Sequence, residues 1–241
     1  MSALSEKNSD QNRKIVVVQG KDIYEYRAFY KKFERAKYIS HLDLYRAIQR
    51  TFQRANIPVW YTEGYHPHIY LTFPMPIFLG CEGVEESFDF RTTVDCPPSQ
   101  LMEQLNAAFP EGIRITKVQA PVHKASEIAK ADYTLLFTAD ELDNASLLTK
   151  WEAFVSQSQI PATKHTKKGP KEIDLKPMIY AMDTKLTEKG LLVQMQVCCG
   201  IEQNLNATLV TDAFASKEGL SLNYHLIRRE QMLMENGEKF S

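Results

Sequence analysis

The chain has 241 residues and a mass of 27.7 kDa, enough for one large domain or two small ones. Apolar residues make up 44% and charged residues 24%, which is the composition of a globular protein with its own core. The 29 basic and 30 acidic residues give a net charge of −1, which excludes binding of nucleic acid through overall positive charge. Any site for a polyanion must therefore be a local patch.

The N-terminal residues 1–14 are polar and show no periodic pattern, which predicts a disordered leader. The longest apolar run near the start, residues 15–18, is too short for a signal peptide or a membrane span. We therefore expect a cytoplasmic protein with no membrane partner.

The four cysteines form no CxxC or CxxxCxxC motif, since they stand at positions 81, 96, 198 and 199. This spacing argues against a cysteine-only zinc site and against a self-contained iron–sulfur cluster, so we expect no cofactor. The adjacent Cys198 and Cys199 are typical of small buried side chains in a reduced, cytosolic protein.

The first half of the chain contains alternating strand-like and helix-like segments. They are predicted, in order, as a strand at residues 26–39, a helix at 40–55, strands at 59–62, 68–73 and 87–94, a helix at 97–109 and a strand at 113–118. Ser40 is a good N-cap for the first of these helices, and Asn56 and Pro58 end it.

The second half repeats this order of elements. It is predicted to contain a strand at 133–138, a helix at 140–156, a basic stretch at 164–171, strands at 173–183 and 191–199, a helix at 207–215 and a strand at 224–233. Because each half resembles a βαββαβ unit, the sequence predicts an α+β fold of two tandem ferredoxin-like units. We place them at residues 15–122 and 131–241.

The helix at residues 40–55 has two contrasting faces at 100° per residue. The face expected to pack on a sheet carries Leu42, Tyr45, Ile48 and Phe52, and the opposite face carries Arg46, Arg50 and Arg54. Guanidinium groups at this spacing suit phosphates, which they bind through paired hydrogen bonds. The alternative is a solvated face on which Asp43 pairs with Arg46.

Residues 27–54 contain eight basic and two acidic residues, a local charge of +6. Five aromatic residues are interleaved with these cations or lie beside them: Tyr26, Phe29, Tyr30, Phe33 and Tyr38. Basic strands with aromatic residues bind single-stranded RNA by phosphate attraction and base stacking. Alternatively, half of these aromatic side chains face the core, because strand residues alternate between faces.

Two further segments are candidates for binding. His66 and His68 point the same way on an extended chain and are candidate metal ligands or an acid–base pair, with His41 or Asp43 as a third group. A binding loop shaped by Gly64 and Pro67 is the alternative. The basic stretch contains Lys164, Lys167, Lys168 and Lys171. It is either a second phosphate-binding lobe or a solvated loop.

Several of these segments resemble one family. The motifs that carry the resemblance are residues 38–44 (YISHLDL) with Arg46 and Arg50, then Pro58, Glu63-Gly64-Tyr65, Pro67-His68, the set Gly80, Glu82, Glu86 and Asp89, and residues 172–177 (EIDLKP). Over about residues 26–235 the chain resembles the radical-SAM-linked protein family, a bacterial domain found alone or fused behind a radical S-adenosylmethionine enzyme. The resemblance implies a separately encoded radical SAM enzyme as partner, and it adds Glu86 and Asp174 to the candidate binding residues.

Three functions follow from these features. The first is a non-catalytic accessory module of a radical SAM enzyme that binds RNA or presents a substrate. The second is a metal-independent endoribonuclease resembling the CRISPR RNA-processing proteins, with His41 and either Tyr38 or Tyr65 as acid and base. The third is a small-molecule or peptide-binding protein, whose site is lined by Glu63, His66, His68 and Glu86. The sequence leaves open whether any reaction is catalysed.

The candidate site residues fall into three groups. The catalytic candidate is His41, and the metal candidates are His66 and His68. The binding candidates are His41, Asp43, Arg46, Arg50, Glu63, Gly64, His66, His68, Glu86, Lys167, Lys168 and Asp174.

Overall fold

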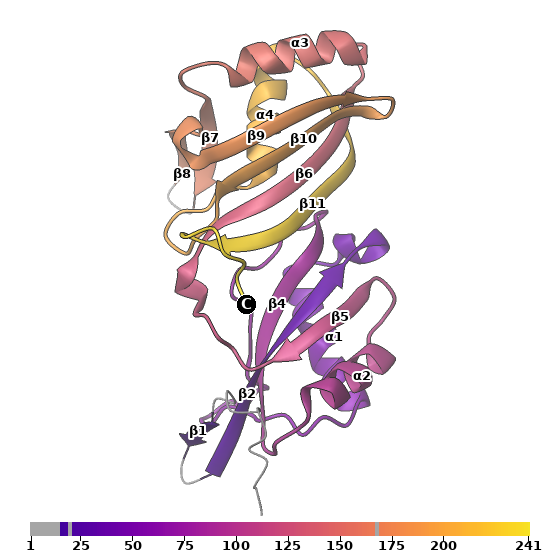
Figure 1. Ribbon diagram of the computed structural model, residues 1–241, viewed down its shortest axis with the longest axis vertical. Helices are drawn as coiled ribbons and strands as arrows, with labels where there is room; N and C mark the ends of the chain where they lie inside the picture. Colours follow the sequence, from indigo (N-terminus) through magenta and orange to yellow (C-terminus); the bar gives the residue numbers. More distant parts are fainter. Residues whose placement is uncertain (1–14, 19–20, 167–168) are drawn as a thin grey trace, which may run out of the picture.

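The computed structural model describes residues 15–18, 21–166 and 169–241, so the predicted leader and the candidates Lys167 and Lys168 lie outside the described residues. The fold is α+β, as predicted, with a large mixed sheet and few helices (Figure 1). The α-helices are α1 (His41–Arg54), α2 (Pro98–Ala108), α3 (Asn144–Val155) and α4 (Ala207–Glu218). The strands are β1 (Ile15–Val18), β2 (Lys21–Lys32), β3 (Leu71–Thr72), β4 (Glu82–Thr92), β5 (Ile113–Gln119), β6 (Ile128–Ala139), β7 (Pro161–Thr166), β8 (Gly169–Asp174), β9 (Ile179–Thr187), β10 (Gly190–Cys198) and β11 (Leu222–Met234). Three short 3-10 helices are η1 (Glu34–Tyr38), η2 (Ala125–Glu127) and η3 (Lys176–Met178).

In the first half, the elements run β2, α1, β3, β4, α2, β5, and the strands lie side by side in the order β5-β2-β4-β3. Each neighbouring pair is antiparallel. Both helices contribute to one core, which includes Ile48 and Phe52 of α1, Leu101 and Leu105 of α2, and Phe88 of β4. The helices therefore cover one face of these strands.

The second half has the same connectivity. Its elements run β6, α3, β9, β10, α4, β11, and its strands lie in the order β11-β6-β10-β9, again antiparallel. Trp151 of α3 and Phe214 of α4 are fully buried against each other and against the strands. The hairpin of β7 and β8 forms a separate two-stranded sheet between α3 and β9.

The two halves join edge to edge. β4 pairs with β11 in parallel, with Glu82 opposite Arg228 and Gly83 opposite Arg229, which produces one nine-stranded sheet. Figure 1 shows β4 and β11 meeting near the middle of the long axis. The first half thus continues directly into the second through backbone hydrogen bonds.

Some predicted elements differ in the structure. The first strand ends at Lys32 instead of residue 39, because Glu34 adopts a left-handed φ of 52° and η1 follows. In place of strands at 59–62 and 68–73 there are isolated bridges and the two-residue β3, because only single residues such as Val59 and Tyr61 and the pair Leu71–Thr72 are paired with a neighbouring segment. The described parts of the basic stretch, residues 164–166 and 169–171, are strand residues of the β7–β8 hairpin.

Candidate functional site

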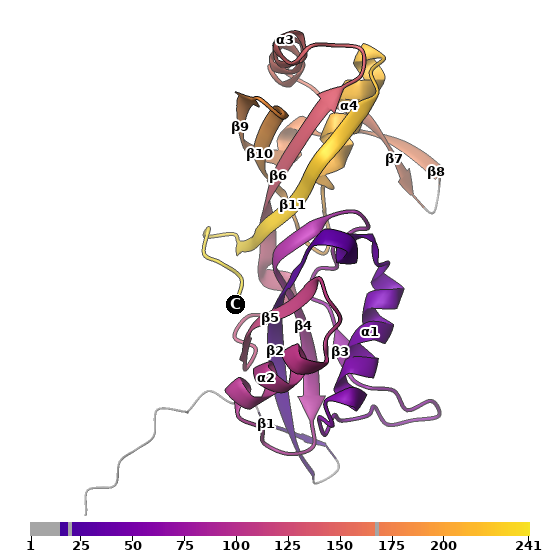
Figure 2. The same cartoon turned by 90° about the vertical axis from the view of Figure 1, so that its right-hand side faces the viewer.

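The solvent face of α1 carries the predicted arginine stripe. Arg46, Arg50 and Arg54 are all exposed, and Figure 2 shows α1 along one side of the first half. Arg46 Nη1 lies 3.2 Å from Asp43 Oδ1, in an ion pair whose side chains are both more than half exposed. Arg54 Nη2 donates to the Ala108 carbonyl oxygen at 2.8 Å and so binds the end of α2. Arg46 and Arg50 are therefore the members of the stripe best placed for an external phosphate.

The inner face of α1 differs from the prediction at one position. Leu42 is 57% exposed, whereas Leu44 is buried together with Ile48 and Phe52. Leu42 and Leu44 are separated by about 200° around the helix, so only one of them can face the sheet. Leu42 thus adds an apolar side chain to the exposed surface of α1.

The start of α1 is fixed by its cap. Ser40 Oγ accepts a hydrogen bond from the Asp43 backbone N–H at 3.1 Å and donates to Asp43 Oδ2 at 2.7 Å. These contacts lower the pKa of the Asp43 carboxyl, with the Ser40 hydroxyl as the main cause and Arg46 as a further one. The Asp43 carboxylate is therefore already engaged by the helix cap and by its ion pair with Arg46.

His41, the catalytic candidate, lies on the exposed first turn of α1. The edge of its ring contacts Phe73, with the ring centres 4.7 Å apart. Partial desolvation lowers the pKa of His41, and the positive charge of Lys32 lowers it further. The imidazole is therefore neutral near pH 7, the form in which a histidine accepts a proton.

Lys32 connects His41 to a buried ionic cluster. Its side chain is buried, Nζ donates to the Ile39 carbonyl oxygen at 3.1 Å, and burial lowers its pKa while the charge of Glu86 opposes that shift. Glu86 in turn is ion-paired with Arg229. This role of Lys32 was not predicted from the sequence, in which it is one of the eight basic residues of segment 27–54. Strand alternation was the available signal, because Lys32 shares the inward face of β2 with Tyr26 and Tyr30.

The acidic residues of the Gly80–Asp89 motif act as internal ion-pair partners. Glu82 contacts Lys37 at 3.4 Å, Glu86 pairs with Arg229, and Asp89 accepts two hydrogen bonds from Arg27 at 2.7 and 2.9 Å. Glu86 is 2% exposed and is therefore closed to an external ligand. This motif joins β4 to η1, β11 and β2.

The loop at residues 62–68 is exposed almost throughout. Gly64 has a φ of +125°, which a residue with a side chain rarely adopts. His68 Nδ1 lies 3.0 Å from Thr62 Oγ1 and 3.1 Å from the His66 carbonyl oxygen. Tyr65, at the tip, is 93% exposed. The loop thus presents Glu63, His66 and Tyr65 to solvent on a backbone that is fixed at its base.

The candidate metal ligands do not come together. Within the described ranges, no group of three or more His, Cys, Asp and Glu side chains is placed to hold a metal ion. His41 packs on Phe73, whereas the ring of His66 contacts Tyr65 in the loop.

The aromatic residues proposed to stack on RNA bases are mostly core residues. Tyr26, Phe29 and Tyr30 are buried, and only Tyr38, at 68%, is strongly exposed. β2 pairs with β4 along one edge and with β5 along the other, and its residues 25–30 are buried on both faces of the strand. Among the eight cations of the +6 segment, Arg27 and Lys32 are buried as well. The exposed ones are Lys31, Arg35, Arg46, Arg50 and Arg54.

Asp174 closes the base of the β7–β8 hairpin. Its Oδ1 accepts from the backbone N–H groups of Ile160 at 2.8 Å and Lys176 at 3.0 Å. Lys171 on β8 is exposed. Asp174 is therefore committed to the local fold and is not placed as a ligand group.

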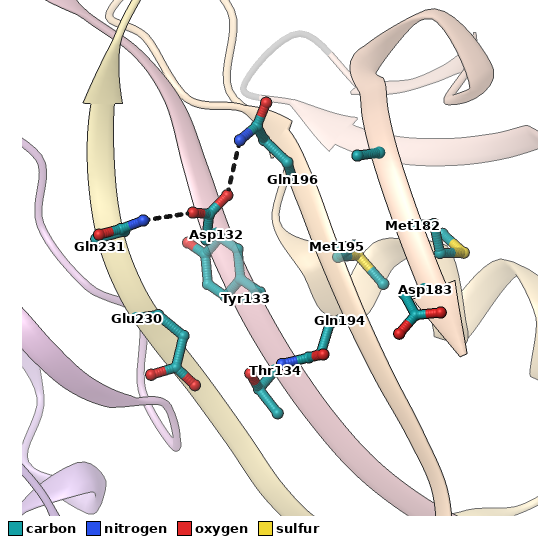
Figure 3. A pocket seen from close by; sticks show the side chains of 11 residues that line it. Asp132, Tyr133, Thr134, Met182, Asp183, Gln194, Met195, Gln196, Glu230 and Gln231 are labelled. Atoms are coloured by element: carbon teal, nitrogen blue, oxygen red, sulfur yellow. Dashed lines mark hydrogen bonds between the residues drawn. The ribbon is translucent and has the colours of Figure 1, made fainter. Parts of the chain in front are cut away.

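A second polar surface lies on the open face of the second half. Strands β6, β9, β10 and β11 line a hollow of about 470 Å³, and Asp132 of β6 is one of its lining residues (Figure 3). The Asp132 carboxylate accepts from Gln196 Nε2 at 3.0 Å and from Gln231 Nε2 at 2.7 Å. No motif in the sequence pointed to this hollow, because its residues come from four separate strands.

Comparison with known proteins identifies a family. A family model described as "Uncharacterized protein conserved in bacteria (DUF2344)" matches residues 25–207. No curated protein matches the chain. Among solved structures, the chain is similar to part of a "Cbf5-Nop10-Gar1 Complex", with 10% identity and a TM-score of 0.46 over 78% of this chain and 45% of that chain. It is also similar to "an Unknown Protein from Galdieria sulphuraria", with 8% identity and a TM-score of 0.26 over 84% and 97% of the two chains. The chain thus spans less than half of the first of these.

None of the helices in the described part of the chain has the length and apolar character needed to cross a membrane.

Proposed function

We propose that this chain, which belongs to the DUF2344 family of uncharacterized proteins conserved in bacteria, is a non-catalytic module that binds RNA on the exposed face of α1. The observation that carries the proposal is the exposure of Arg46 and Arg50, one helical turn apart, on a helix whose other face is fixed in the core. We take the two halves, residues 15–122 and 131–241, as ferredoxin-like units, which their shared strand order supports. In this proposal the module works in the cytoplasm with a separately encoded radical SAM enzyme.

The surface beside α1 supplies the two interactions that single-stranded RNA needs. The guanidinium groups of Arg46 and Arg50 attract phosphates, and exposed Tyr38 and Tyr65 offer aromatic faces for bases. The loop that carries Tyr65 is held near the helix, because Tyr45 Oη of α1 donates to the Ile69 carbonyl oxygen at 3.5 Å.

A salt titration of RNA binding tests this proposal. Each phosphate neutralised on a single strand contributes about −0.7 to the slope of log K against log salt, so the Arg46→Ala/Arg50→Ala variant should flatten the slope by roughly 1 to 1.5. The matched control is Lys185→Ala/Lys189→Ala, which removes two exposed cations from the second half and should leave the slope unchanged. Failure of the wild-type protein to bind RNA at low salt, or equal slopes for both variants, refutes the proposal.

An endoribonuclease is the second candidate, favoured by the exposed, neutral imidazole of His41. A general base of this kind needs no metal. RNA incubated with the protein and a chelator distinguishes the two functions: a module leaves the RNA intact. Cleavage by the wild-type protein that His41→Ala abolishes, with binding retained, would establish the nuclease instead.

A further inference from the structure

The hollow around Asp132 takes no part in the proposed RNA site. It lies on the face of the second-half strands that α3 and α4 leave open, because Leu135 and Phe137 of β6 face the helices while Thr134 lines the hollow. Figure 3 shows side chains from β6, β10 and β11 converging on Asp132. This surface is built from side chains of separate strands that the fold alone brings together.

The charge of the hollow is negative and only partly compensated. Its lining contains the carboxylates of Asp132, Asp183 and Glu230 and no lysine or arginine. Asp183 pairs with Lys185 of its own strand at 3.1 Å, and Glu230 pairs with Arg228 at 2.8 Å. Asp132 receives only the two neutral glutamine amides, so it is the carboxylate of the hollow without a cationic partner among the described residues.

Thr134 provides the second observation. The residue is only 5% exposed and lines the hollow, yet its hydroxyl forms no hydrogen bond with any residue that the structure describes. The hydroxyl oxygen is not one of the described side-chain atoms that are buried without a partner, so it stays accessible from the hollow. The Thr134 hydroxyl and the exposed amide of neighbouring Gln194 are therefore free to bind a group placed beside Asp132.

We propose that this hollow binds an arginine side chain from an extended segment of a partner protein. A guanidinium group has five N–H donors and no acceptor, which matches a carboxylate, a hydroxyl and an amide oxygen on one surface. The uncompensated charge of Asp132 favours a cation, and three lining carboxylates disfavour the phosphates of RNA. Arginine binding here is independent of the proposed function at α1.

The peptide acetyl-Gly-Arg-Gly-amide is the probe, titrated into the full-length ¹⁵N-labelled protein and followed by NMR. Shifts should concentrate at residues 132–134, 194–196 and 230–231. Asp132→Asn should weaken binding roughly tenfold, the effect of losing one charge-assisted hydrogen bond. Thr134→Val keeps the shape and removes the hydroxyl, and it should weaken binding by a smaller factor. Glu188→Gln, an exposed acid outside the hollow, is the matched control and should change nothing.

Three comparisons decide the assignment. The same peptide with neutral citrulline in place of arginine should bind much more weakly, and the lysine peptide should lie between them. Equal binding of the citrulline or lysine peptide, equal effects of Asp132→Asn and Glu188→Gln, or the same shifts with a short single-stranded RNA would each overturn the proposal. Arg46→Ala/Arg50→Ala should retain full peptide binding, so failure at the hollow and failure of RNA binding at α1 are separate results.

Discussion

Glu86 of β4 and Arg229 of β11 form a buried ion pair across the junction of the two halves, with Arg229 Nε 2.8 Å from Glu86 Oε1. Each side chain is 2% exposed. Arg229 Nη2 also donates to the Met75 carbonyl oxygen at 2.7 Å. Burial works against the charge of Arg229, but the Glu86 carboxylate outweighs it and raises the pKa of the guanidinium. The ion pair therefore stays charged. It links the two halves at a junction where β4 and β11 are paired through only two pairs of residues.

Removing the charge of Glu86 should strongly destabilise the protein. Glu86→Gln leaves a buried guanidinium without a counter-charge, and we expect a loss of about 3–5 kcal/mol in the free energy of unfolding, measured by urea denaturation. Glu82→Gln is the matched control, because Glu82 pairs with the more accessible Lys37 and should lose only about 1 kcal/mol. Equal losses would contradict the assigned role of the pair.

The two buried charges should compensate for each other. The double variant Glu86→Met/Arg229→Met removes both charges and should be clearly more stable than Glu86→Gln, since no unpaired ion remains. A double variant less stable than the single one would show that the hydrogen bond to Met75 dominates.

His41 should titrate below the ordinary histidine pKa of 6.5. Because the unfolded chain then binds this proton more tightly than the folded chain, the contribution of His41 to stability falls as the pH drops below 6.5. Lys32→Met removes one of the two causes and should move the pKa of His41 upward. NMR titration of the His41 ring in both proteins measures the shift, and a wild-type pKa above 6.5 would refute the assignment.

The three arginines of α1 should differ in how much they contribute to the free energy of unfolding. Arg54→Ala loses the hydrogen bond to the Ala108 carbonyl oxygen and should cost about 1 kcal/mol. Arg46→Ala and Arg50→Ala change exposed positions and should stay within about 0.5 kcal/mol of the wild type. Urea denaturation of the three variants tests this difference, which vanishes if Arg54 is only a solvated side chain.

Tyr65 should contribute to RNA binding but not to stability, whereas Tyr30 should contribute to stability. Tyr65→Ala removes an exposed ring, so it should leave stability unchanged and weaken RNA binding by about 1–3 kcal/mol if a base stacks there. Tyr180→Ala, a half-exposed tyrosine in the second half, is the control for RNA binding. Tyr30→Ala empties a core position and should cost about 3–5 kcal/mol of stability. Unchanged RNA affinity in Tyr65→Ala would remove the loop from the proposed site.

Local sequence was sufficient to determine the elements that depend on local interactions. The periodicity and the Ser40 cap predicted α1 within one residue at each end, and they predicted that Arg46 and Arg50 face solvent. These features depend on residues within one or two helical turns of each other, so the pattern contains the information. The α+β class likewise follows from the alternation of segments along the chain.

Only the tertiary structure decided which charged and aromatic groups are internal. Alternation shows that Tyr30 and Lys32 share a face of β2, but it cannot show that the helices cover this face or that Glu86 lies close to Lys32. The pairing of Glu86 with Arg229 spans 143 residues, and the hollow at Asp132 combines four strands. Such contacts arise when distant strands pair in one sheet, and no short-range pattern determines which strands become neighbours.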